Sequence, residues 1–78
     1  MTITYDKQAD ASYIYIKKGS ISYTKQINDW LMLDCDKKGD ILGIEILGSE
    51  HKQDSLAYLS QLLSDKKVLE ECRKILEY

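Results

Sequence analysis

The chain has 78 residues, of which 44% are hydrophobic and 31% charged, and its formal net charge is -2 at pH 7. This length excludes a second domain, because compact domains seldom have fewer than about 50 residues, and the composition excludes a disordered or membrane protein. No apolar run approaches the ~20 residues of a membrane span, and the first residues lack the pattern of a signal peptide. We therefore expect a cytoplasmic protein without membrane contact.

Residues 1–48 alternate between apolar and polar side chains in short runs, which is typical of β-strands. The breaks between these runs are too short for parallel crossovers, so the simplest arrangement is an antiparallel meander. Gly39 lies in the last break, where we expect it to supply the positive φ of a hairpin turn. The expected strands are residues 2–5, 11–17, 21–27, 30–36 and 41–47.

Residues 49–78 have apolar side chains at helical spacing and form a helical tail. Asp54 or Ser55 can cap a first helix, and Ser64 or Asp65 can cap a second. Without Gly or Pro between them, the two stretches are also compatible with one continuous helix. The sequence thus predicts a single α+β domain at 1–78, with a five-stranded sheet at 1–48 and one or two C-terminal helices packed on one face.

The fourth and fifth strands predict two different sheet faces. A hairpin at Gly39 places Leu33 opposite Ile44 and Cys35 opposite Leu42 on one face, which we assign to the core. The other face carries Trp30, Met32 and Asp34, facing Leu47, Glu45 and Gly43. In the second strand, the alternation leaves open whether Ser12, Ile14 and Ile16 or Ala11, Tyr13, Tyr15 and Lys17 face the core. Because one or two helices cover only one face, either the sheet curls or a second copy covers the other face, and we expect a homodimer or higher homo-oligomer.

The segment 34–45 has the spacing of a calcium loop, with Asp34, Asp36, Gly39 and Glu45 at EF-hand ligand or turn positions. Lys38, however, occupies a position that needs an oxygen ligand, and the flanking segments alternate like strands. We therefore favour a polar hairpin turn. One histidine and two distant cysteines give no zinc-site spacing either, so we expect no metal and no cofactor.

No nucleophile motif, Gly-rich phosphate loop or second histidine is present, so no catalytic residues are assigned. Glu45 is flanked by isoleucines in a strand, and it either accepts a structural hydrogen bond from Tyr13 or Tyr15 or serves a function. Tyr13, Tyr15 and Lys17 form a surface on which bases could stack, but the absence of a basic stripe argues against nucleic acid. The candidates for binding a ligand or partner are Asp10, Tyr13, Tyr15, Trp30, Asp34 and Glu45.

Two blocks of the sequence, YDKQADASYIYI at 5–16 and DCDKKGDILGIEIL at 34–47, carry a family resemblance. They resemble the small prokaryotic proteins grouped as domain of unknown function 2283, whose pattern is Y-D-x-x-x-D-[AS]-x-Y-I followed by D-x-D-x-x-G-x-[IVL]-x-G-I-E-I-L. The resemblance implies a compact sheet domain of no established activity. Because some of the family's genes are thought to lie beside small toxin-like genes, it also implies an antitoxin or partner-binding role.

Two hypotheses about function follow. The first is a non-enzymatic interaction module that associates with itself and with a protein partner, which fits the thin core and the two-faced sheet. The alternative is a small ligand-binding or hydrolytic protein, with a site between subunits formed by Asp10, Tyr13, Asp34 and Glu45.

Overall fold

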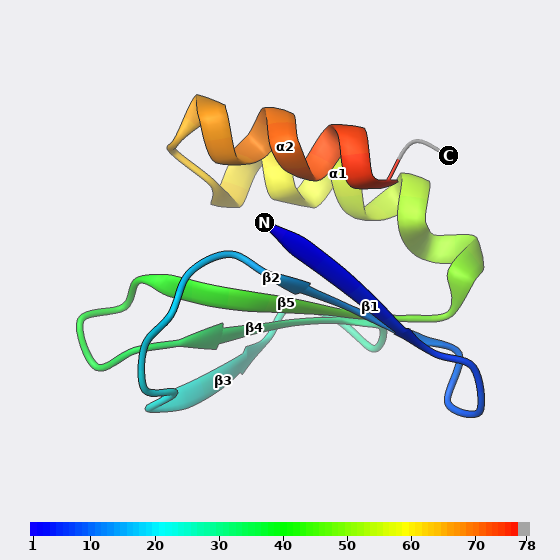
Figure 1. Ribbon diagram of the computed structural model, residues 1–78, viewed down its shortest axis with the longest axis horizontal. Coiled ribbons are helices and arrows are strands. Elements are labelled where there is room, and N and C mark those ends of the chain that lie inside the picture. Colours follow the sequence, from blue (N-terminus) through cyan, green and yellow to red (C-terminus); the bar gives the residue numbers. More distant parts are fainter. Residues whose placement is uncertain (77–78) are drawn as a thin grey trace.

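The computed structural model describes residues 1–76, which form a five-stranded antiparallel sheet with two helices on one face (Figure 1). The α+β class is therefore confirmed. Residues 77 and 78 of the expected helical tail lie outside the described part. No helix within residues 1–76 is long and apolar enough to cross a membrane. The elements are β1 (Thr2–Asp6), β2 (Ala11–Tyr15), β3 (Tyr23–Gln26), β4 (Leu31–Cys35), β5 (Ile41–Leu47), the 3-10 turn η1 (Ser49–His51), α1 (Lys52–Leu62) and α2 (Lys66–Leu76).

The strand order is β1-β2-β5-β4-β3, so the expected meander is wrong. Between β2 and β3 lie two other strands, a separation of about 14 Å at the usual strand spacing. The connection at residues 16–22 can span up to about 23 Å, and backbone hydrogen bonds from Ile16 to Leu42 and from Ser22 to Cys35 hold its two ends. The sequence analysis expected these strands at 11–17 and 21–27, which are longer than the observed β2 and β3. Only residues 18–20 then remained between them, and so short a break suggested a hairpin.

Burial explains why β5 is central and β3 is at the edge. On β5, Leu42, Ile44 and Ile46 are each at most 4% exposed, whereas all four residues of β3 are exposed. A strand without an apolar face gains no burial from a central position, and an edge strand with a lysine such as Lys25 resists pairing with other chains. The strand order therefore follows the hydrophobic pattern more closely than it follows the chain order.

The core lies between the sheet and the two helices (Figure 1). On β2, Ser12 and Ile14 are buried, which settles the open choice for that strand and leaves Tyr13 and Tyr15 on the opposite face. The helices contribute Leu59, Cys72 and Leu76, each at most 1% exposed. The buried residues of the core cluster are Ile14, Leu31, Leu33, Cys35, Ile44, Ile46, Leu59, Cys72 and Leu76.

The tail consists of two helices rather than one. Leu63 leaves the helical conformation after α1, and Oδ1 of Asp65 accepts hydrogen bonds from the backbone N–H groups of Lys67 and Val68 at 2.9 and 3.3 Å. Asp65 therefore caps α2, and it is one of the two caps that the sequence predicted for this helix. The predicted cap of α1 is wrong, because that helix begins at Lys52 and has no side-chain cap.

The β4–β5 turn explains the calcium-like spacing. Oδ1 of Asp36 accepts the backbone N–H groups of Lys38 and Asp40 at 2.9 and 3.0 Å, so this carboxylate stabilises a hairpin. Leu33 lies opposite Ile44 as predicted, but a bulge at Asp34 and Cys35 places Cys35 opposite Ile41 instead of Leu42.

Gly39 has a φ of 92° in this turn, as predicted. We expect Gly39→Val to lower the free energy of unfolding by about 1 to 3 kcal/mol, because a β-branched residue is strained at positive φ. Urea denaturation measures this loss. Lys37→Val is the control, since Lys37 is exposed in the same turn and has no positive φ. Equal losses in the two variants would contradict the role assigned to the glycine.

Candidate functional site

The face of the sheet opposite the helices has no covering layer within residues 1–76 (Figure 1). The strand register places alternate residues of all five strands on this face. We call this surface the open face. Its members are Thr2, Thr4 and Asp6 of β1, Ala11, Tyr13 and Tyr15 of β2, Gly43, Glu45 and Leu47 of β5, Met32 and Asp34 of β4, and Thr24 and Gln26 of β3.

A hydrogen-bond network crosses the middle of the open face. The Tyr13 hydroxyl donates to Oδ2 of Asp34 at 2.5 Å, and the Thr24 hydroxyl donates to Oδ1 of the same carboxylate at 2.6 Å. Tyr13 lies on β2 and Asp34 on β4, so the phenol reaches across the intervening β5. The network therefore joins β2, β4 and β3 through side chains, although β2 and β4 do not pair directly through their backbones.

Gly43 makes this reach sterically feasible. It lies on β5 directly opposite both Tyr15 and Asp34. A Cβ at this position would overlap the hydroxyl and ring carbons of Tyr13, so the phenol lies closely over the glycine. Glycine weakens a strand interior and often marks such a close approach.

Tyr13 remains a hydrogen-bond donor over the physiological pH range. Its burial is the main cause that raises the pKa of the hydroxyl, and the hydrogen bond to Asp34 and the negative charges of Asp34 and Glu45 raise the pKa further. This phenol is thus held in its neutral, hydrogen-bond-donating form.

Glu45 is a half-buried carboxylate that has no hydrogen bond or ion pair with any residue in the described part of the chain. It lies opposite Tyr13 on one side and Met32 on the other. The expected hydrogen bond from Tyr13 or Tyr15 is wrong, because the Tyr13 hydroxyl donates to Asp34. The Tyr15 ring instead packs edge-on against that of Tyr13, with 4.7 Å between centroids, and Tyr15 is 53% exposed.

Asp10 lies on the helical side of the molecule, away from this network. Its carboxylate accepts the Tyr5 hydroxyl at 2.5 Å and the N–H of Ser49 at 3.2 Å, while its carbonyl accepts the N–H of Gly48. The Tyr5 hydrogen bond, followed by that of Ser49, lowers the pKa of Asp10. Asp10 therefore fixes the point at which the chain leaves the sheet for the helices.

Trp30 is not on the open face, contrary to the prediction from strand alternation. Its ring stacks on His51 with 4.4 Å between centroids and meets Tyr58 edge-on at 5.5 Å, and both partners belong to the helical part. Trp30 precedes β4, so the alternation of that strand does not determine its direction. Of the six candidate residues, the structure brings together Tyr13, Tyr15, Asp34 and Glu45.

The six candidates did not include Thr24, nor Gly43 and Met32, although strand alternation had placed the last two on this face. A glycine inside a strand pattern was a usable signal for Gly43. Thr24 had no such signal, because its partner depends on the register of an edge strand. The tyrosine and aspartate motifs of the two sequence blocks nevertheless pair as Tyr5 with Asp10 and Tyr13 with Asp34.

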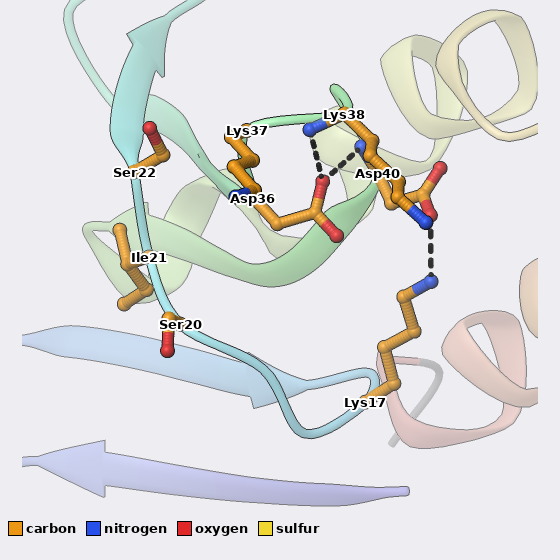
Figure 2. Close-up of a pocket in the computed structure, with 8 residues that line it drawn as sticks. All are labelled: Lys17, Ser20, Ile21, Ser22, Asp36, Lys37, Lys38 and Asp40. Carbon is orange, nitrogen blue, oxygen red and sulfur yellow. Dashed lines mark hydrogen bonds and ion pairs between the residues drawn. The ribbon is translucent and has the colours of Figure 1, made fainter.

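A pocket of about 620 Å³ lies between the β2–β3 connection and the β4–β5 turn (Figure 2). Its lining includes Lys17, whose Nζ lies 3.0 Å from Oδ2 of Asp40, and Asp36, which bonds the turn backbone. These charged groups hold loops together, and none of the open-face network lines this pocket. No cluster of three potential His, Cys, Asp or Glu metal ligands exists within residues 1–76.

We expect Gly43→Ala to lower the free energy of unfolding by about 1 to 3 kcal/mol, because the new methyl group displaces the Tyr13 phenol and leaves Oδ2 of Asp34 without its donor. Urea denaturation of Tyr13→Ala, Gly43→Ala and the double variant forms a double-mutant cycle. In the Tyr13→Ala background, the second substitution should cost almost nothing. Full additivity would show that the close approach of Tyr13 is not what requires glycine.

No curated protein and no solved structure matches the chain. A family model described as protein of unknown function (DUF2283) matches residues 2–49. This stretch is more than half of the chain, and it contains all five strands, the open-face network and the Asp10 contacts with Gly48 and Ser49. The chain therefore belongs to the DUF2283 family of proteins of unknown function.

Proposed function

We propose that this protein is a non-enzymatic interaction module that binds another protein through the open face of its sheet. The observation that carries this proposal is the uncovered group of Tyr13, Tyr15 and Met32 on that face. The uncovered face of a two-layer antiparallel sheet is ordinarily polar. Tyrosine and methionine are enriched in protein interfaces relative to the rest of the surface.

The arrangement of the carboxylates favours an interaction module over a hydrolytic or ligand-binding site. Asp10 bonds groups on the helical side, Asp36 bonds a turn, and Asp34 accepts two hydroxyls. The four residues of the alternative site, Asp10, Tyr13, Asp34 and Glu45, thus do not converge as a set. Acid–base catalysis needs such groups within hydrogen-bond reach of one reacting atom.

The charges on the open face favour a different protein over a second copy of this chain. Asp34 and Glu45 lie near its centre, and no lysine or arginine occupies a strand position on it. A twofold interface pairs the same patch with itself, so these acids would face an equally acidic patch without a compensating base from the strands. An antitoxin, which neutralises a second protein by binding it, is a module of this kind.

Photo-crosslinking in the native host tests the proposal. A photoreactive phenylalanine analogue replaces Tyr15 on the open face or Ile21, which is equally exposed in the β2–β3 connection. We expect one discrete adduct with a different protein from position 15 that disappears with Met32→Glu, and no such adduct from position 21. The same adducts from both positions, or none from position 15, would refute the proposal. An adduct of twice the chain's own mass would assign the face to a second copy instead.

We also expect Glu45→Gln to raise the melting temperature at pH 7, corresponding to about 0.5 kcal/mol. Glu45 is half-buried without a partner in the described part of the chain, and Asp34 is its diagonal neighbour on the adjacent strand β4. Residues kept for binding often reduce the stability of the free protein. Differential scanning calorimetry measures the shift, with Glu70→Gln on α2 as a control for the charge change. A fall in melting temperature would indicate a structural role for Glu45.

A further inference from the structure

We propose that the open face around Glu45 binds an arginine side chain of the partner protein. This inference rests on the proposed function and names the chemistry through which the face recognises its partner. It follows from three observations: an unpaired carboxylate, two tyrosine rings beside it, and a network that fixes one of those rings.

The carboxylate supplies the charge. Glu45 is half-buried between Tyr13 and Met32 and has no cation or donor in the described part of the chain. Directly opposed side chains in antiparallel strands have Cβ atoms about 4.5 to 5.5 Å apart. A cation that pairs with Glu45 therefore lies within reach of the Tyr13 and Met32 side chains.

The tyrosines supply aromatic surface. The rings of Tyr13 and Tyr15 meet at 65° with 4.7 Å between centroids, which gives two differently oriented walls. A cation over an aromatic face gains roughly 0.5 to 2 kcal/mol, with the larger values at sites shielded from water. Tyr13 and Glu45 lie opposite each other, so both attractions act on the same bound group.

The Asp34 network makes one wall rigid before any partner arrives. The Tyr13 hydroxyl is held by Asp34 at 2.5 Å, and Asp34 is held in turn by Thr24 at 2.6 Å. Neither group must be ordered on binding, so the entropic cost of association is reduced. Tyr15 is more than half exposed and can adjust to the bound side chain.

Arginine fits this site better than lysine. Its planar guanidinium stacks on an aromatic ring and forms two parallel hydrogen bonds with a carboxylate, and it loses its hydration more readily than an ammonium group. Anionic partners such as nucleic acid are disfavoured, since Asp34 and Glu45 lie at the centre of the face without a neighbouring base in any of the five strands.

The test uses three capped octapeptides that alternate serine with arginine, lysine or citrulline. Citrulline has nearly the shape of arginine without its charge. Binding to the 15N-labelled protein is followed by NMR, which also shows that each variant is folded. We expect the arginine peptide to shift NMR signals of β2, β4 and β5 and to bind about tenfold or more tightly than the lysine peptide. The citrulline peptide should not bind.

Two variants separate the site from general electrostatic attraction. Glu45→Gln should weaken binding of the arginine peptide by about tenfold, whereas Glu70→Gln, with the same charge change on an exposed helix residue, should leave binding unchanged. The inference would be overturned if both variants weakened binding of the arginine peptide equally, or if the lysine peptide bound as tightly as the arginine peptide. NMR shifts scattered over the helices would overturn it as well. If the crosslinked adduct from position 15 is lost with Met32→Glu but kept with Glu45→Gln, protein binding by the open face is upheld and the arginine site is refuted.

Discussion

The central strand β5 is buried beneath the helices on one face and, at Gly43, beneath a tyrosine ring on the other, and this burial constrains the rest of the molecule. On one side Leu42, Ile44 and Ile46 lie beneath the helices, and on the other Gly43 lies beneath the Tyr13 ring. A strand in this position must pair on both edges, so β2 and β4 flank it. The chain then has to carry the polar β3 past two strand ends to the outer edge. Strand order, the long β2–β3 connection and the open-face network all follow from the place of β5.

The sequence predicted the elements well because their periodicities are local. All five strands, the two apolar helical stretches, the pairing of Leu33 with Ile44 and the positive φ of Gly39 were visible in residue spacing. Strand order was not predictable in this way, since the decisive fact is that Tyr23–Gln26 lacks an apolar face. The expected connection between β2 and β3 was so short that it favoured placing the two strands side by side, and this consideration decided the prediction of a meander.

The candidate site was predicted only in part. Strand parity placed Asp34 and Glu45 on one face but left open whether Tyr13 and Tyr15 lie there with them, whereas Asp10 and Trp30 bond or stack with the helical part. Parity gives the direction of side chains inside a strand and fails in turns and at strand ends. It also could not choose between Asp34 and Glu45 as the acceptor of Tyr13, because that choice depends on the length of the phenol and on the empty space above Gly43.

Asp10 has a wider consequence for how this chain is built. Through Ser49 and Gly48 it fixes the direction in which the chain leaves the sheet, and the family match ends at residue 49. The stretch that matches the family thus contains the sheet together with the contact that directs the chain out of it. The place where the helical layer starts is therefore set by a turn of the sheet that lies 39 residues earlier in the chain.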